Sequence, residues 1–177
     1  MSSLTALSLF GGRLRRITPD RLALFALLLI VAAALALRLY GISWDEGYPY
    51  TPHPDERAIL QHVEGISPPA VGDLGQLFNS EESSWNPNWF PYGSLPLYLL
   101  KGVEFVYEGV SGNRLTDLRL IARVISSLAD VMALIATYLL AARFFGRRVG
   151  ITAAGLMAIA VIHIQLSHFY AVDTLLT

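Results

Sequence analysis

The chain has 177 residues, a formal net charge of −1 and no cysteine, and 54% of its residues are hydrophobic while only 15% are charged. A soluble domain carries about 25% charged residues, so this composition argues against one. It also excludes a collagen, a disulfide scaffold and a disordered tail. The near-zero charge gives no footprint for nucleic acid, and the absence of cysteine excludes thiol catalysis.

The first apolar block predicts a transmembrane helix over 22–40. Leu22–Leu37 carries no charge, and Arg38 lies near the end, where its side chain can snorkel to the membrane interface. As a helix, 22–40 measures about 28 Å, close to a hydrocarbon core of about 30 Å. A cleaved signal peptide is the competing interpretation, but no small-residue cleavage site leads to a suitable mature start. We therefore predict a cytoplasmic N-terminus over 1–21 and an uncleaved span.

Two further apolar blocks predict transmembrane helices over 118–142 and 149–167, since eighteen helical residues measure about 27 Å. The segment near 94–110 is less apolar, and we predict that it lies at the membrane interface without crossing; its proline and charged residues are Pro96, Lys101, Glu104 and Glu108. The predicted fold class is therefore an all-α membrane protein with three transmembrane helices and an outer loop with short interfacial helices.

The arginines orient these three spans. One group precedes the first span and the other fills the short loop 143–148; together they are Arg13, Arg15, Arg16, Arg21, Arg143, Arg147 and Arg148. Three spans place both groups on one side, which the positive-inside rule makes cytoplasmic. The loop 41–117 and the tail 168–177 then lie on the extracytoplasmic side.

The outer loop contains two acidic pairs, Asp45-Glu46 and Asp55-Glu56. The second pair opens a predicted short helix, with Pro54 at its first position and Gly65 at its C-terminal cap. In one interpretation the pair only complements the helix dipole. In the other, it joins Asp173, which the topology places on the same side, to hold a base for a hydroxyl nucleophile and a divalent cation. Asp173 can also simply cap the helix that follows it.

Asp130 lies near the middle of the second span, where a carboxylate is costly and is a functional candidate by default. Ser126 lies one turn earlier and can hydrogen-bond to it, and Arg123 lies on nearly the same face. We favour a structural role for Asp130 in packing. A path for ions or substrate, as in a small transporter or channel subunit, is the alternative.

The histidines do not form a zinc-ligand pattern, although His53 and His168 remain candidate metal ligands. The aromatic and proline cluster over 85–92 is typical of an interfacial anchor. Because aromatic faces stack on pyranose rings, the same cluster also suits a sugar subsite.

Several motifs occur in a specific order: Leu37-Arg38-Leu39-Tyr40, His53-Pro54-Asp55-Glu56-Arg57, Pro91-Tyr92-Gly93-Ser94-Leu95-Pro96-Leu97-Tyr98, Phe145-Gly146-Arg147-Arg148-Val149-Gly150 and Val172-Asp173-Thr174. In this order and spacing the chain resembles the N-terminal part of a GT-C glycosyltransferase, over almost its whole length from about Arg21. The most similar members are bacterial phospholipid-carrier-dependent enzymes, similar to protein O-mannosyltransferases of the family-39 type and to aminoarabinose transferases.

The resemblance implies a plasma-membrane enzyme that transfers a sugar, a hexose such as mannose, from a polyprenyl-phosphate donor. The acceptor hydroxyl belongs to a protein, lipid or glycan outside the cytoplasm, and transfer proceeds with inversion. The essential acidic pair of the family maps onto Asp55 and Glu56, with Asp45 as the second choice of base. The second acidic residue of the family maps onto Asp173. A divalent metal ion, where needed, would have Asp55, Asp173 and His168 as its ligands.

The leaving phosphate needs cationic partners, for which the candidates are Arg57, Lys101, Arg119 and Arg123. Many bacterial relatives place a lysine in a Lys-Pro-Pro-Leu stretch, but this chain has Gly93–Leu97 there and no lysine. Family members also have many more spans, so we expect a truncated GT-C module that is inactive alone. A transporter subunit and a non-enzymatic membrane anchor are the alternatives to an enzyme.

Overall fold

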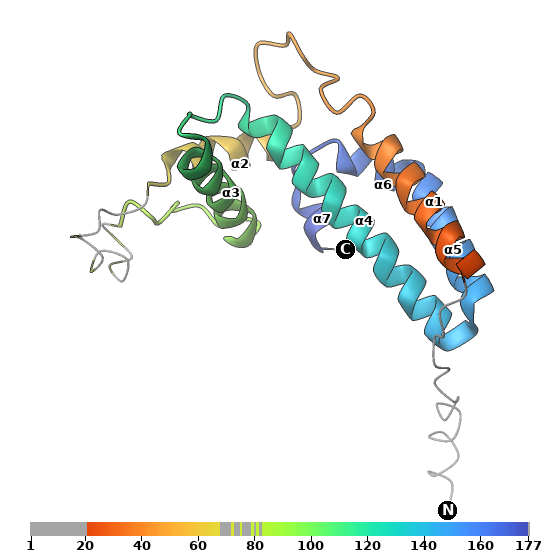
Figure 1. Cartoon of the computed structure of the whole chain (residues 1–177). Coiled ribbons are helices and arrows are strands. Elements are labelled where there is room, and N and C mark those ends of the chain that lie inside the picture. Colours follow the sequence, from red (N-terminus) through yellow and green to blue (C-terminus); the bar gives the residue numbers. More distant parts are fainter. Residues whose placement is uncertain are drawn as a thin grey trace, which may run out of the picture.

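The computed structural model describes residues 21–67, 72, 75, 79, 81 and 83–176. This part of the chain forms α-helices and no strand. In chain order the helices are α1 (Arg21–Leu39), α2 (Pro54–Gly65), α3 (Leu95–Ser111), α4 (Leu118–Phe145), α5 (Arg147–Ile159), α6 (Val161–Ser167) and α7 (Val172–Leu176). Helices α1, α4 and α5 lie side by side as a bundle, and α2 and α3 pack together near the start of α4 (Figure 1). The prediction of an all-helical protein is confirmed for the described residues.

Two helices, α1 and α4, are long and apolar enough to cross a membrane, and α5 with α6 makes a third candidate that is bent by 57°. At about 1.5 Å per residue, the 19 residues of α1 measure about 28 Å and the 28 residues of α4 about 42 Å. The predicted spans 22–40 and 118–142 correspond to α1 and α4. The third apolar block, predicted as one helix over 149–167, forms two helices instead.

The break between α5 and α6 lies at Ala160, whose backbone is extended and whose N–H donates to the Met157 carbonyl at 3.3 Å. Neither proline nor glycine stands at the break. Arg38 reaches it from α1 and donates to the carbonyl oxygens of Ala158 at 3.1 Å and Met157 at 3.4 Å. These bonds satisfy carbonyls near the end of α5. The prediction that Arg38 snorkels to the membrane interface is wrong, because the residue is fully buried.

Small residues bring α4 and α5 close together. Gly150, Ala154 and Ala158 form the buried stripe of α5. A Cβ atom at Gly150 would lie 2.9 Å from both the Ala142 Cβ and the Tyr138 carbonyl oxygen, so only glycine fits there without a shift. Helices in membranes associate through such stripes because close approach of the backbones maximises van der Waals contact.

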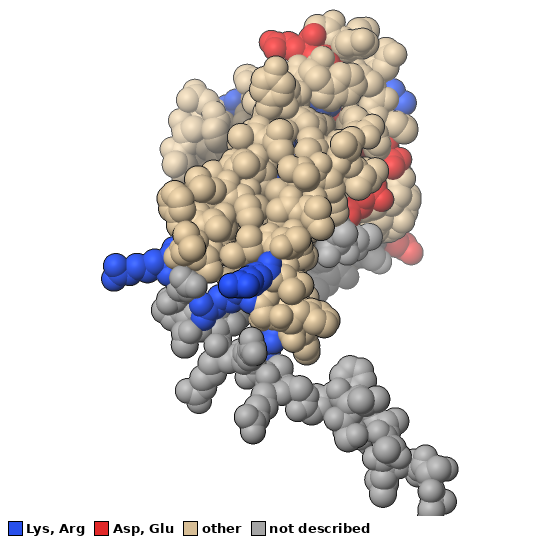
Figure 2. All heavy atoms as spheres, turned by 90° about the vertical axis from the view of Figure 1, so that its right-hand side faces the viewer, with Lys and Arg blue, Asp and Glu red and all other residues tan. Residues whose placement is uncertain are grey.

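The bundle has two chemically different ends. Figure 2 shows Lys and Arg side chains gathered near the start of α1, with Asp and Glu farther from that end on this face. We call the turn between α4 and α5 the basic end; its arginines are Arg143, Arg147 and Arg148. We call the opposite end, where α4 begins and α2 and α3 pack, the loop end. Arg13, Arg15 and Arg16, which the sequence analysis assigned to the same cytoplasmic side, lie outside the described residues.

Helix α2 begins with Pro54 at its first turn, as predicted, and the backbone N–H of Glu56 donates to the His53 ring at 3.4 Å. Its C-terminal cap is Ile66, one residue after the predicted Gly65. The apolar face of α2 packs against α3 in a buried core that includes Ile59, Val63, Leu97 and Leu100. Helix α3 corresponds to the predicted interfacial helix near 94–110 and is not one of the candidate spans. This core holds the start of α2 at the loop end.

Candidate functional site

A fully buried arginine organises the loop end. The guanidinium of Arg123, on α4, donates from Nε and Nη2 to the two Glu56 oxygens at 2.8 and 2.7 Å. It also donates from Nη1 and Nη2 to the two Asp45 oxygens at 2.7 and 2.8 Å. Its remaining N–H donates to the Ile42 carbonyl at 2.8 Å. A guanidinium has five N–H donors, so none is left for a ligand. We call Arg123, Asp45 and Glu56 the loop cluster.

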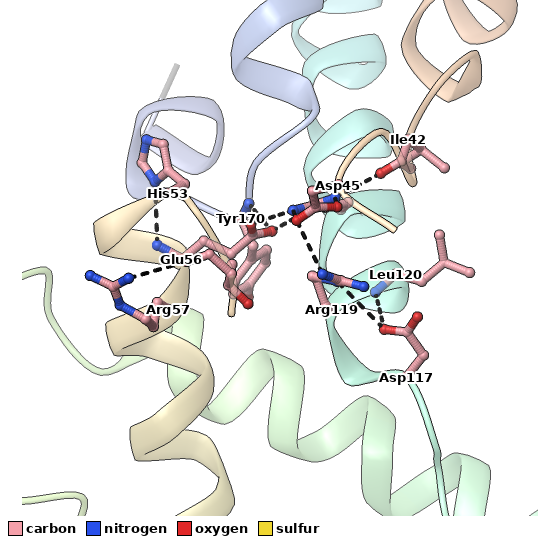
Figure 3. Close-up of polar contacts among 11 residues, drawn as sticks. Ile42, Asp45, His53, Glu56, Arg57, Asp117, Arg119, Leu120 and Tyr170 are labelled. Atoms are coloured by element: carbon pink, nitrogen blue, oxygen red, sulfur yellow. Dashed lines mark hydrogen bonds and ion pairs between the residues drawn. The ribbon is translucent and has the colours of Figure 1, made fainter. Parts of the chain in front are cut away.

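Glu56 ties three segments of the chain together. Figure 3 shows its side chain, from α2, and that of Asp45, from the loop after α1, meeting beside α4. The backbone N–H of Tyr170 also donates to Glu56 Oε1, at 3.1 Å. Glu56 is fully buried. This predicted catalytic residue therefore lies in a structural position, where it fixes the start of α2 against α4 and the segment before α7.

Asp45, the second choice of base, is fully buried as well. Burial acts to raise the pKa of Asp45, but the hydrogen bonds and charge of Arg123, together with the charge of Arg119, outweigh it and hold the pKa below its usual 3.8. Arg119 Nη1 lies 3.1 Å from Asp45 Oδ2. A carboxylate stabilised in its charged form by two arginines is a poor proton acceptor. Of the two aspartates proposed as the base, Asp55 is therefore the better candidate.

Asp55 has a different environment on the first turn of α2. It is half-buried, and its Oδ1 accepts a hydrogen bond of 2.9 Å from the Tyr92 hydroxyl. This hydrogen bond raises the pKa of Tyr92, with smaller contributions from desolvation and from the charges of Asp55 and Asp173. Asp173, on α7, is exposed. Tyr92 therefore contacts Asp55, and the charge of Asp173, 118 positions from Asp55 in sequence, also acts on its hydroxyl.

Aromatic rings stand beside Asp55. The rings of His62 and Trp89 stack with centroids 4.3 Å apart, and Trp89 meets Tyr92 edge-on at 5.6 Å. At about 100° per residue, His62 and Asp55 lie on the same side of α2. Part of the aromatic cluster 85–92 therefore packs against α2 next to Asp55.

The third predicted metal ligand is not aimed at the two carboxylates. Both ring nitrogens of His168 face backbone carbonyls, Nδ1 that of Ile164 at 2.7 Å and Nε2 that of Tyr40 at 2.9 Å. Within the described parts of the chain, no three His, Asp or Glu side chains are grouped as metal ligands. The predicted ligand set of Asp55, Asp173 and His168 is therefore not assembled as a whole in the described residues.

The four predicted phosphate ligands are dispersed. Arg123 has no free donor, and Lys101 on α3 pairs with Glu104 at 2.9 Å. Arg57 and Arg119 line a polar pocket of about 520 Å³ between α2 and the start of α4. Arg57 follows Asp55 by two residues, so it lies about 200° around α2, on the opposite side of the helix. The predicted cations therefore do not converge on Asp55.

A second charged cluster lies inside the bundle, and the sequence analysis missed it. Asp130 Oδ2 meets Arg38 Nε at 2.5 Å, and Asp130 Oδ1 meets His163 Nδ1 at 2.6 Å. We call these three residues the span cluster. The predicted bond from Ser126 to Asp130 does not form, since Ser126 Oγ has no hydrogen-bond partner in the structure. The sequence did contain a clue to this pair. Arg38 and Asp130 carry opposite charges and lie in separate apolar blocks, where each charge needs a partner.

Comparison of the chain with protein-family models, curated proteins and solved structures gives no match. The functional interpretation therefore rests on the motifs and the resemblance described from the sequence, and on the geometry above.

Proposed function

We propose that this membrane protein takes part in sugar transfer from a polyprenyl-phosphate donor to an acceptor hydroxyl, with Asp55 as the base. The observation that carries the proposal is the half-buried carboxylate of Asp55 at the loop end, which accepts a hydrogen bond from the Tyr92 hydroxyl; the charge of Asp173 also acts on that hydroxyl. The resemblance to GT-C glycosyltransferases supplies the reaction and the hexose. The positive-inside rule assigns the basic end to the cytoplasm, so transfer would occur outside it, at the surface of the plasma membrane.

The chemistry follows from the two oxygens of one carboxylate. Tyr92 donates to Asp55 Oδ1, so Oδ2 is the oxygen that takes the proton from the acceptor hydroxyl. The resulting alkoxide-like oxygen attacks the anomeric carbon of the sugar. A new C–O bond forms as the bond from that carbon to the phosphate oxygen breaks, and the phosphate departs with the lipid. Attack from the side opposite the leaving group inverts the configuration.

The loop cluster supports this chemistry without taking part in it. Glu56 is adjacent to Asp55, and its bonds to Arg123 and to the Tyr170 N–H fix the first turn of α2. A base contributes only when it is held within hydrogen-bond reach of its substrate. Glu56 and Asp45 are thus proposed as positioning residues.

The leaving phosphate needs a counter-charge, and the arginines and the lysine do not converge on Asp55. A divalent cation held by Asp55 and Asp173 fits this need, since Mg²⁺ is commonly bound by one or two carboxylates, water and substrate phosphate. Bound there, the ion would neutralise charge on the leaving phosphate.

The test is a transfer assay in liposomes on a full-length relative that carries the same Asp55 and Asp173 motifs, with polyprenyl-phosphate mannose as donor and a serine-containing peptide or an oligosaccharide as acceptor. Asp55→Asn should lower the rate by about 10²- to 10⁴-fold, the usual contribution of a general base. Glu46→Gln, a change at the exposed half of the other acidic pair, is the matched control and should leave the rate unchanged. Normal transfer by Asp55→Asn would show that another group is the base. No transfer by the unaltered full-length relative, from any polyprenyl-phosphate hexose tested, would contradict the proposed function itself.

The transporter alternative depends on Asp130. Its carboxylate is fully buried and paired with Arg38, which also binds the carbonyls at the α5–α6 break. This pairing favours a structural role. Solute flux through liposomes that Asp130→Asn abolishes would favour the transporter instead.

A further inference from the structure

A polar pocket lies on the side of α2 that faces away from Asp55. It is an open pocket with a volume of about 520 Å³, lined by α2, the residues before it and the start of α4. Its polar side chains include Arg57, Gln61 and Glu64 from α2 and Asp117 and Arg119 from the start of α4. Small-molecule sites typically measure about 300–1,000 Å³. The pocket is therefore large enough for a ligand, and nothing in the proposed transfer uses it.

The charges that line the pocket balance. Two guanidinium groups, of Arg57 and Arg119, face two carboxylates, of Glu64 and Asp117. Arg119 is also paired with the buried Asp45 at 3.1 Å. The pocket thus offers no net field that would attract either an anion or a cation. A phosphate that approached the two arginines would also meet the two carboxylates, and their repulsion would offset the attraction.

The same lining is dense in hydrogen-bond donors and acceptors. Arg57 has five N–H donors and uses one toward the Thr51 carbonyl at 3.4 Å, and it forms no ion pair with a described carboxylate. Gln61 offers both a donor and an acceptor, and Glu64 and Asp117 offer acceptors. A lipid tail in this pocket would leave these groups without partners, which costs free energy. The matching ligand carries many groups that both donate and accept, and no net charge.

An aromatic ring completes the pocket. Tyr50 lines it, and the Arg57 guanidinium lies over the Tyr50 ring at 5.8 Å from the centroid. This contact holds the guanidinium plane in place while leaving its edge donors available. A sugar ring presents hydroxyl groups around its edge and C–H groups on its faces, which suit the planar polar side chains and the aromatic ring respectively.

We propose that this pocket binds a neutral saccharide. Hydroxyl groups satisfy donors and acceptors at once, so a polyhydroxylated ligand fits a balanced, polar lining better than an ion does. The pocket lies at the loop end, beside the first turn of α4, and is open on one side. The inference concerns binding alone and goes beyond the proposed transfer, because its residues lie on the opposite side of α2 from Asp55.

The test is a titration of the full chain in lipid nanodiscs, which avoids the sugar headgroups of maltoside detergents. The probes are mannobiose as a neutral disaccharide, glucuronate as an anionic sugar and inorganic phosphate, and binding is measured by calorimetry and by saturation-transfer NMR. We expect saturable binding of mannobiose whose dissociation constant changes less than twofold between low and high salt. Arg57→Ala and Gln61→Ala should each weaken it about tenfold, the factor expected for about 1.4 kcal/mol of lost hydrogen bonding.

Two controls locate the site. Arg114→Ala removes an exposed arginine and Glu46→Gln an exposed carboxylate, both outside the pocket lining; both variants should bind mannobiose within twofold of the unaltered chain. Binding of phosphate or glucuronate but not of mannobiose would overturn the inference in favour of an anion site. Absence of saturable binding by all probes would also overturn it, as would equal weakening by Glu46→Gln and Arg57→Ala. None of these outcomes depends on whether transfer occurs.

Discussion

The loop cluster and the span cluster each contain a fully buried arginine, but they balance its charge differently. Arg123 meets two carboxylates, Asp45 and Glu56, and Arg119 contributes a second positive charge at the edge. Arg38 meets the single carboxylate of Asp130, and its other N–H donors meet backbone carbonyls. Uncompensated charge is costly in the hydrocarbon core of a membrane. The span cluster accordingly pairs Arg38 with one carboxylate and with neutral backbone carbonyls.

The two clusters also join different parts of the chain. The loop cluster connects the loop after α1, α2, α4 and the Tyr170 backbone, and it lies next to Asp55. The span cluster connects α1, α4 and the two halves of the bent third segment. The two arginines therefore have different roles. Arg123 positions the candidate site, whereas Arg38 holds the bundle together at the break between α5 and α6.

Arg123→Met should give the largest loss of stability. Removing the guanidinium leaves two buried carboxylates, Glu56 and Asp45, whose negative charges repel each other without the Arg123 charge between them. This change costs about 3–5 kcal/mol of unfolding free energy. Arg38→Met should cost less, on the order of 1–3 kcal/mol, because Asp130 keeps its contact with His163. Both are measured by reversible unfolding in bicelles. Arg119→Met, at a partly exposed position, is the control and should cost at most about 1 kcal/mol. Equal losses for Arg123→Met and Arg38→Met would contradict the distinction between the clusters.

Acid should weaken the loop cluster through Asp45. Its pKa in the folded chain lies below that in the unfolded chain, so its contribution is complete above the unfolded value of about 3.9 and is lost as the pH falls toward the folded value. The slope that this one group adds cannot exceed about 1.4 kcal/mol per pH unit. Asp45→Asn should lower stability near neutral pH and reduce the acid slope below pH 4. An unchanged slope in that variant would show that Asp45 is not held in its charged form.

Tyr92→Phe should have the smallest effect of the three, and should act on transfer more than on folding. It removes one hydrogen bond to Asp55, worth about 0.5–1.5 kcal/mol, so transfer should fall by up to about tenfold. A normal transfer rate in Tyr92→Phe would mean that the Tyr92 hydroxyl does not position Asp55.

The sequence predicted the local elements well. The apolar blocks gave α1 and α4, and Pro54 marked the start of α2, because length, composition and capping act within one segment. The break at Ala160 was not predictable in the same way. No proline or glycine marks it, and its carbonyls are satisfied by Arg38, which is more than 110 residues away in sequence.

The site was predictable only in part. The sequence singled out Asp55 and Asp173, and the structure shows that Asp55 accepts a hydrogen bond from Tyr92, a partner that the sequence did not indicate. The partners of Arg123 were missed because helical periodicity shows which residues share a face and not which segments meet it. Glu56 lies 67 positions from Arg123 and Asp45 lies 78 positions from it, so only tertiary packing selects these pairs.

The most direct test of the account compares Asp55→Asn with Glu56→Gln, two adjacent substitutions of similar size, for transfer rate and for thermal unfolding in the same liposomes. The account predicts that Asp55→Asn loses transfer at an unchanged unfolding temperature, whereas Glu56→Gln lowers the unfolding temperature because it weakens a buried ion pair. Loss of transfer in Glu56→Gln at an unchanged unfolding temperature, together with normal transfer in Asp55→Asn, would contradict it.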